Sequence, residues 1–414
     1  MSRIMQSSSD KGLEAWGVSQ FVKDATDEGY YYEFPMLDSN SGPLIQVQGK
    51  KLINFSSIDF LGFQTEQWVR EAFISSIEEV GLVTGGSRAT QGVNRSHSDL
   101  EVLISEVTGK QRTSTFASGL LANLGFLQAM TTRFEVNSSI YVDNSDVVVI
   151  MDHDAHWSLW KGAQHLKFGE RLFSFKHNDV KDLWRCLERN KGKKTLVVVE
   201  TIYSSDGSMA PLGEILDLCE NFEAISYVDN ANGFMIYGDQ SRPYYNEYCH
   251  LPRATFEMLS LSKSIGLEGG AISGPKSGII LVEVASGTSV FTASIQPPTA
   301  ATATRIISYL KENPAVIDQY LERISTLREQ LSKQGFSLLP GNSYIISIML
   351  GRDTVAERVR EDLLTMGFQV PIFRYPAVKR NAAVMRLMVN RLHSERHISE
   401  FLSAMEKIKR RYSL

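Results

Sequence analysis

Cysteine is scarce in this chain of 414 residues. The three cysteines, Cys186, Cys219 and Cys249, lie far apart, and no two of them have the C-x-x-C spacing. Neither a disulfide framework nor a thiolate zinc site is therefore supported. We expect a protein of a reducing compartment and predict that it is cytoplasmic.

Long apolar runs are also missing, although 43% of the residues are hydrophobic. No uninterrupted stretch approaches the roughly 18–20 apolar residues that a membrane helix needs. The N-terminal sequence MSRIMQSSSDKGLEAW lacks the apolar core of a signal peptide. We therefore expect neither a transmembrane segment nor a secretory leader.

The chain has no excess of basic charge either. Lys and Arg number 43 against 47 Asp and Glu, so the formal net charge is −4. A surface that follows nucleic-acid phosphates is expected to be clearly basic. The composition therefore argues against a nucleic-acid partner and is otherwise typical of soluble globular proteins.

Short β-branched runs alternate with amphipathic stretches between about residues 68 and 275. The clearest strand-like runs are 147–150, 196–199 and 225–228. Continuously apolar strands are typical of a parallel sheet with helices on both faces, which predicts an α/β fold. An acid follows each run closely, namely Asp152, Glu200 and Asp229. Ligands bind at the carboxyl ends of such strands, so we expect these acids to line a pocket.

The pattern changes after Gln296-Pro297-Pro298. A long helical pattern follows to about residue 331, and after it come two strand-like runs and a terminal helix. We expect three parts: an N-terminal arm over residues 1–55, a large α/β domain over 56–300 and a smaller C-terminal α+β domain over 301–414.

Lys263 is the first candidate for covalent chemistry. Small hydroxyl residues flank it, with an apolar stretch before it and glycines after it. A lysine that forms a Schiff base needs a depressed pKa, and hence desolvation or cationic neighbours. The serines around it could hold a phosphate. The alternative is an exposed loop lysine.

Asp229 and His156 are candidates for contacts with an aromatic cofactor. Asp229 either caps the turn after its strand or pairs with a pyridinium nitrogen. His156 lies in a segment rich in acids and histidines, where it packs locally, binds a divalent metal or stacks on a cofactor ring. No matching ligand cluster occurs elsewhere in the sequence, so we expect no metal site.

A turn that opens a helix is predicted at Ser118-Gly119-Leu120. Free backbone N–H groups at such a turn bind phosphate, although many glycine-started helices bind nothing. A phosphate turn, a stacking histidine, a strand-end aspartate and a lysine follow one another along the chain. This order resembles that of fold-type I pyridoxal-phosphate enzymes.

Over nearly its whole length the sequence resembles the α-oxoamine synthase family, which includes aminolevulinate synthase, amino-oxononanoate synthase and serine palmitoyltransferase. The segments that carry the resemblance are residues 85–88, 97–101, 118–119, 122–123, 176–179, 200–212, 262–263, 269–270, 291–294, 297–298 and 386–387. Residues 155–163 are further similar to autoinducer synthases, which make long-chain α-hydroxyketone-type signals.

The resemblance implies a fold-type I transferase, whose large domain has a mostly parallel seven-stranded sheet between helices, with pyridoxal 5′-phosphate as cofactor. It implies that Lys263 binds the cofactor covalently and moves protons at the substrate Cα. Asp229 would pair with the pyridine nitrogen, and His156 would stack on the ring. The residues implied to bind the phosphate are Ser118, Gly119, Leu120 and Ser260, with Thr292 and Ser294 of a partner subunit. The resemblance therefore implies a homodimer in which each active site is shared between the two subunits.

The remaining implied contacts concern the ring hydroxyl and the substrate. Ser204 would contact the hydroxyl, and so would Asn232, which stands where the family usually has histidine. Arg386 would hold the amino-acid carboxylate in a bidentate pair. Ile58 replaces a residue of an Asn-rich stretch, and we expect it near the substrate.

The implied reaction condenses an α-amino acid with an acyl thioester, expected to be an acyl-CoA. It yields an α-aminoketone, CO2 and a free thiol, for a quorum-sensing signal or a sphingoid-like lipid. Two alternatives remain open at this stage. One is another fold-type I reaction such as transamination, and the other is a non-catalytic pyridoxal-phosphate-binding protein.

Overall fold

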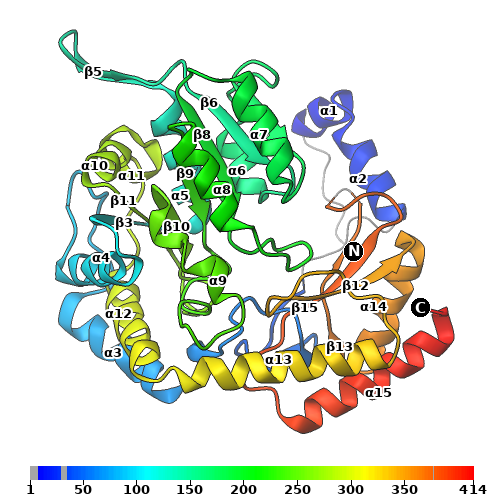
Figure 1. The fold of residues 1–414 in the computed structure, drawn as a ribbon. Helices are drawn as coiled ribbons and strands as arrows, with labels where there is room; N and C mark the ends of the chain where they lie inside the picture. The colour runs from blue at the N-terminus through cyan, green and yellow to red at the C-terminus, as the bar shows by residue number, and fades with distance from the viewer. Residues whose placement is uncertain (1–7, 29–34, 376) are drawn as a thin grey trace.

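The computed structural model describes residues 8–28, 35–375 and 377–414 (Figure 1). Two parts of the predicted N-terminal arm, residues 1–7 and 29–34, lie outside the described residues. None of the described helices is both long and apolar enough to span a membrane.

A seven-stranded sheet forms the centre of the fold, with the strand order β3-β11-β10-β9-β8-β6-β7. Its strands are β3 (Arg112–Phe116), β6 (Val148–Asp152), β7 (Leu172–Phe175), β8 (Thr195–Glu200), β9 (Ile225–Asp229), β10 (Phe256–Ser260) and β11 (Gly270–Gly274). Neighbouring strands from β10 to β7 are parallel, and β11 is antiparallel to both β10 and β3. The predicted mostly parallel sheet is confirmed.

Alternate side chains of the central strands enter two different cores, which explains their continuous apolar runs. In β8, Val197 and Val199 pack into one cluster, and Leu196 and Val198 pack into the other. Because successive side chains of a strand point to opposite faces, a strand covered on both sides needs apolar residues throughout.

Helices cover both faces of this sheet (Figure 1). Buried residues of α5, α6 and α10 join the core on one face, and buried residues of α4, α7 and α8 join the core on the other. The helices are α1 (Ser8–Ala15), α2 (Val18–Asp27), η1 (Phe63–Thr65), α3 (Gln67–Val80), α4 (Arg95–Thr108), α5 (Gly119–Thr131), α6 (Trp157–Gly162), α7 (Val180–Arg189), α8 (Leu212–Asn221), α9 (Tyr245–Tyr248), η2 (Leu251–Arg253), α10 (Lys276–Ala285), α11 (Gly287–Val290), α12 (Pro297–Glu312), α13 (Ala315–Lys333), α14 (Asp353–Thr365) and α15 (Glu395–Tyr412).

Three smaller sheets complete the fold. They are β12-β15-β14, β1-β2-β13 and the hairpin β4-β5, which projects from the body in Figure 1. Their strands are β1 (Leu44–Val47), β2 (Lys50–Asn54), β4 (Arg133–Asn137), β5 (Ile140–Asp143), β12 (Ile346–Gly351), β13 (Phe368–Gln369), β14 (Ile372–Phe373) and β15 (Ala383–Leu387). Strand β2, inside the predicted arm, pairs with β13 far along the chain. The three-part division stays a prediction, and its boundary at residue 300 falls within α12.

Candidate active site

The sheet brings the predicted acids and the predicted lysine to one edge. Glu200 ends β8, Asp229 ends β9, and the two residues are paired in the register of these strands. Lys263 lies in the loop that joins β10 to β11. The carboxyl ends of parallel strands meet at the same edge, where ligands bind in folds of this kind.

Asp229 is a buried acceptor with a fixed orientation. Its Oδ2 accepts a hydrogen bond from Asn123 Nδ2 at 2.9 Å, and its Oδ1 accepts one from the Ala231 amide at 2.9 Å. Asn123 is itself held, because its amide also donates to Ser158 Oγ and its oxygen accepts from the Tyr227 hydroxyl. The carboxyl group is therefore aimed before any ligand binds.

His156 is the residue just before α6, and both its side chain and its backbone amide form hydrogen bonds. Its Nδ1 lies 2.7 Å from Ser158 Oγ, and its backbone amide donates to Glu200 Oε1 at 2.6 Å. Burial in the site lowers the pKa of His156, while Asp229 raises it and Lys263 lowers it. The residue nevertheless remains exposed. An uncharged ring that is open on one side fits the predicted stacking role.

The surroundings of Lys263 depress its basicity. Burial lowers the pKa of this lysine, the nearby Asp229 and Glu200 raise it, and Arg386 lowers it further. A lowered pKa increases the share of the neutral amine, which is the nucleophilic form of lysine. Lys263 is thus suited to form a covalent bond with an aldehyde.

The start of α5 is an open anion site. Ser118 caps the helix, and its Oγ accepts from the Leu121 amide at 3.2 Å. Among the described residues, the amides of Gly119 and Leu120 have no hydrogen-bond partner. Unpaired amides at a helix N-terminus carry partial positive charge and bind phosphate.

Two serine hydroxyls lie close to this helix start. Ser260 Oγ is 2.8 Å from Ser262 Oγ. A Cβ on Gly119 would lie 3.7 Å from Ser260 Oγ and 3.0 Å from Met258 Cε, so the end of β10 packs directly against the start of α5. The predicted phosphate residues Ser118, Gly119, Leu120 and Ser260 are therefore brought together.

Arg386 in β15 has an unsatisfied donor. Its Nη1 donates to the Ser204 carbonyl oxygen at 3.0 Å, and its guanidinium lies 4.5 Å from the ring centroid of Phe373. Burial lowers the pKa of Arg386, and its buried Nε has no hydrogen-bond partner among the described residues. A buried guanidinium with a free N–H is suited to a carboxylate ligand.

Asn232 forms two hydrogen bonds within the protein that its predicted role does not require. Its Nδ2 donates to the Ile202 carbonyl at 2.9 Å, and its Oδ1 accepts from the Tyr344 hydroxyl at 3.4 Å. A primary amide has two N–H groups, so one remains for a ligand. Ser204 lies two residues after Ile202 and is half-buried.

Ile58 lines a cavity of about 840 Å³ beside the lysine loop. Ser262 and Gly266 of that loop share this cavity, and the Ile58 side chain is partly exposed to it. That Ile58 lies near a substrate stays a prediction.

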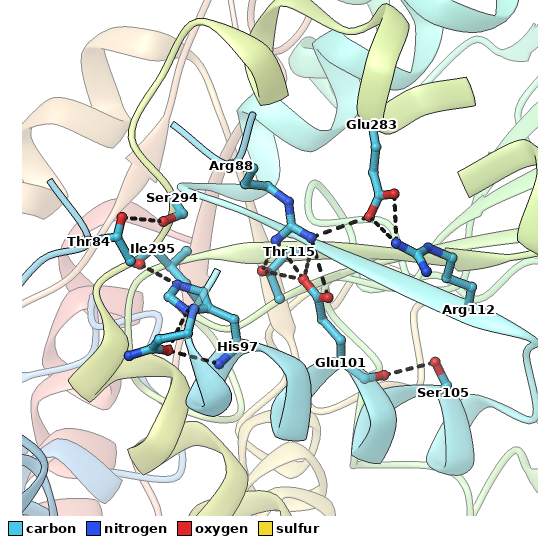
Figure 2. A network of polar contacts seen from close by, with 11 residues as sticks. Thr84, Arg88, His97, Glu101, Ser105, Arg112, Thr115, Glu283, Ser294 and Ile295 are labelled. Atoms are coloured by element: carbon cyan, nitrogen blue, oxygen red, sulfur yellow. Dashed lines mark hydrogen bonds and ion pairs between the residues drawn. The ribbon is translucent and has the colours of Figure 1, made fainter. Parts of the chain in front are cut away.

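Thr292 and Ser294 line a different hollow, of about 480 Å³, with residues 83–87. Ser294 Oγ lies 3.3 Å from Thr84 Oγ1 (Figure 2). Ser87 forms a β-bridge with Ala293. Within the described ranges, no hydrogen bond joins Thr292 or Ser294 to the lysine loop. Ser294 is hydrogen-bonded to Thr84 instead, and the predicted role of Thr292 and Ser294 stays a prediction.

Arg88 anchors the loop that carries this second hollow (Figure 2). Its guanidinium bonds to Glu101 on α4 at 2.7 Å and to Glu283 on α10 at 3.3 Å. Glu101 also accepts from the Thr115 amide on β3, and Glu283 pairs with Arg112. The network ties the loop to three separate elements.

Two residues of the site were not assigned a role from the sequence. Asn123 orients Asp229, and Ser158 bonds both Asn123 and His156. The sequence held one sign of the role of Asn123. This residue lies one helical turn after Gly119, so the two residues are on the same side of α5.

Comparison with known proteins identifies the class of protein to which this arrangement of residues belongs. The model of the aminotransferase class I and II family matches residues 50–405, and the chain belongs to this family. Its sequence is 28% identical over 394 residues to the 8-amino-7-oxononanoate synthase of Thermoanaerobacter pseudethanolicus, covering 94% of this chain and 96% of that protein. The synthase of the same name from Fervidobacterium nodosum is 26% identical over 397 residues, covering 95% and 97%.

Solved structures agree with these sequence relatives. A serine palmitoyltransferase variant from S. paucimobilis with bound PLP and myriocin superposes with a TM-score of 0.86 and 25% identity, covering 97% of this chain and 99% of that chain. The Sphingomonas wittichii serine palmitoyltransferase gives the same TM-score and identity, covering 97% and 98%. The predicted fold-type I fold and the resemblance to α-oxoamine synthases are confirmed.

Proposed function

We propose that the protein catalyses the pyridoxal-phosphate-dependent decarboxylative condensation of an α-amino acid with an acyl-CoA. The products are an α-aminoketone, CO2 and the free thiol. The names of its relatives, an oxononanoate synthase and a palmitoyltransferase, bear out the predicted synthase class, and solved neighbours hold PLP. The observation that carries the proposal is that Lys263, Asp229 and His156 converge at one sheet edge with Arg386, whose Nε is unpaired.

The residues present fit pyridoxal phosphate. Lys263 would hold its aldehyde carbon, Asp229 its ring nitrogen and His156 one ring face. The phosphate would lie on the amides of Gly119 and Leu120, and the hydroxyls of Ser118 and Ser260 would bind it as well. When bound, the cofactor supplies an electron-withdrawing ring that stabilises negative charge at the substrate Cα.

Residues of the chain bind the substrate, hold the cofactor and transfer the protons. Arg386 binds the amino-acid carboxylate, Ser204 and Asn232 hold the ring hydroxyl, and Lys263 takes the proton from Cα and returns a proton at the end. A bond forms between Cα and the acyl carbonyl carbon, and the carbon–sulfur bond breaks to release the thiol. The leaving sulfur takes up a proton to become the free thiol, the carboxyl group leaves as CO2, and Cα takes up a proton in its place. The proton removed from Cα and one proton from solvent supply these two, so atoms and charge balance.

The proposal also covers the amino-acid substrate, the product and the location of the protein. Ile58 would contact the amino-acid side chain, which favours a substrate larger than glycine. The similarity of residues 155–163 to autoinducer synthases favours a signalling product over a sphingoid-like lipid. The small number of cysteines supports a cytoplasmic location.

We also propose that the enzyme is a homodimer in which Thr292 and Ser294 bind the phosphate in the partner's site. The hollow that they line is bordered by exposed apolar side chains: Phe291 is 88% exposed, and Leu82 and Val83 are each 62% exposed. Clustered exposed apolar residues mark interaction surfaces. Covering this patch with a second copy would bury it and complete two sites at once.

The test is a reaction with purified, cofactor-loaded protein, a panel of amino acids and long-chain acyl-CoAs. We expect one amino acid to release carboxyl-derived CO2 and free thiol in equal amounts, and K263A to release neither. Transfer of the amino group to a keto acid without CO2 release would instead identify an aminotransferase. A protein that takes up no pyridoxal phosphate would contradict the enzymatic assignment.

A further inference from the structure

Glu200 is a buried acid that the proposed reaction does not use. It ends β8, is 3% exposed and lies beside Asp229 in the sheet register. Its Oε1 accepts a single hydrogen bond, from the His156 amide at 2.6 Å. Among the described residues, no cation pairs with this carboxyl group within 4.0 Å, and no side chain donates to it.

The two adjacent carboxyl groups differ in their donors. Asp229 accepts from the Asn123 amide group and from the Ala231 N–H, whereas Glu200 accepts only from His156. Hydrogen bonds from N–H groups favour an ionised carboxyl group, and two neighbouring buried carboxyl groups rarely ionise together. Of the two groups, Glu200 therefore has the fewer donors that could stabilise a negative charge.

The surroundings of Glu200 also disfavour a negative charge on it. Burial raises the pKa of Glu200 well above its ordinary value, and the neighbouring Asp229 and Asp152 act in the same direction. Lys263 and the His156 amide oppose burial and Asp229 with smaller effects, and the effect of Asp152 is smaller still. The backbone amide of Glu200 donates to the Tyr203 hydroxyl at 3.4 Å.

We propose that Glu200 is a positioning residue that stays a neutral carboxylic acid, holds the main chain of His156 in place through its hydrogen bond and leaves the contact with the ring nitrogen to Asp229. The link to cofactor chemistry rests on the proposed function. The protonation state and the contact with His156 are properties of the protein alone and can be measured without cofactor.

Two substitutions of Glu200 test its protonation state and its contact with His156 separately. Glutamine keeps a carbonyl oxygen for the His156 amide and an N–H donor in place of the acid O–H, so E200Q mimics the neutral acid. Alanine leaves the His156 amide without its acceptor. An unpaired buried donor is costly, and we expect the loss of this acceptor to reduce cofactor affinity about 10- to 100-fold.

The first experiment measures the infrared carbonyl band of protonated carboxyl groups in cofactor-free protein at pH 8.5. Glu257, whose burial raises its pKa to about 7, is ionised at this pH. We expect a band that disappears in E200Q and remains in the matched control E257Q. It should also remain in D59N, which controls for Asp59, whose pKa is raised by burial.

A wild-type spectrum at pH 8.5 without this band, or one that E200Q leaves unchanged, would overturn the neutral state. If E200Q does not fold, ¹³C-labelled glutamate in the wild type and in E257Q still decides the question. A band at pH 8.5 that shifts with the label in both proteins belongs to a glutamate other than Glu257. A band that does not shift contradicts the proposal.

The second experiment compares cofactor affinity, read from the visible absorption of bound pyridoxal phosphate. We expect E200A to bind about 10- to 100-fold more weakly and E200Q to recover at least tenfold over E200A. E200Q binding as weakly as E200A would overturn the positioning role. If both results hold but no amino acid supports CO2 release, only the proposed function fails.

Discussion

At the scale of single residues, the polar side chains of the site are defined by their neighbours. Lys263, Asp229 and His156 were predictable because a reactive residue type follows a strand or precedes a glycine. The roles of Asn123 and Ser158 were not, since they depend on α5 and α6 packing side by side. Such contacts join residues that are 35 positions apart and leave no local pattern.

Glu257 predicts a pH dependence of stability that is separate from activity. It is fully buried, accepts from Asn230 Nδ2 at 2.7 Å, and burial raises its pKa from 4.5 to about 7. Its neutral form stabilises the fold, so this contribution is complete below pH 4.5 and is lost as the pH rises through 7. At about 1.4 kcal/mol per pH unit, the free energy of unfolding falls by about 3 kcal/mol across this window.

Urea unfolding of the wild type and E257Q from pH 4.5 to 8.5 measures this effect. E257Q keeps the hydrogen-bonded shape without the titration, so the difference between the two proteins should change by about 3 kcal/mol over the range. A constant difference would show that Glu257 does not titrate there.

Arg386 predicts a binding defect that lysine does not repair. Replacing it with alanine removes the group proposed to hold the amino-acid carboxylate, and charged hydrogen bonds contribute about 1.5–3 kcal/mol each. We expect R386A and R386K to raise the KM for the amino acid about 10- to 100-fold, because a lysine cannot form the two-pronged contact. The KM for acyl-CoA should stay near the wild-type value, and an equal rise in both constants would contradict this role.

At the scale of elements, periodicity and composition predicted what is local. The runs at 147–150, 196–199 and 225–228 became β6, β8 and β9. The helical pattern after residue 298 became α12 and α13, separated near Pro314. The pairing of β2 with β13 and the hairpin β4-β5 were not predicted. The first depends on a distant partner. The strands of the second are short and largely exposed, although Phe134 and Val136 alternate with polar residues in β4.

The Arg88 network predicts how firmly the loop of residues 83–88 is held, which the Ser87–Ala293 bridge joins to the segment that carries Thr292. R88A leaves Glu101 without its cation, whereas Glu283 keeps its pair with Arg112, and removing one partner of a buried pair costs about 3 kcal/mol. We expect this loss of unfolding free energy in urea. The matched control is R95A, whose exposed pair with Asp99 is worth less than about 1 kcal/mol. Similar values for the two variants would show that the network is not structural.

At the scale of the whole molecule, the shared site predicts complementation between defective subunits. K263A and T292A are each expected to be impaired, since T292A removes a hydrogen bond to the phosphate, which contributes about 1.5–3 kcal/mol. In a heterodimer of the two, one site carries both lesions and the other carries neither. We expect such heterodimers, isolated with two different tags, to have about half the wild-type activity.

Activity no higher than in the separate variants would mean that Thr292 acts within its own subunit. The oligomeric state itself is checked by light scattering of the wild type and of F291E. This substitution adds charge to the exposed apolar patch and should favour monomers. A monomeric wild type would contradict the homodimer.

The pairing of β2 with β13 has a consequence for how the chain is made. Ile53 and Phe368 are register partners although 315 positions separate them. At roughly 5–20 residues per second, a ribosome needs about a quarter of a minute to a minute to cover that distance. The seven-stranded sheet and its lysine loop, complete by Gly274, emerge in the meantime. The nascent chain can therefore form its cofactor cradle while β2 still waits for its partner, and before the strand that carries Arg386 has been synthesised.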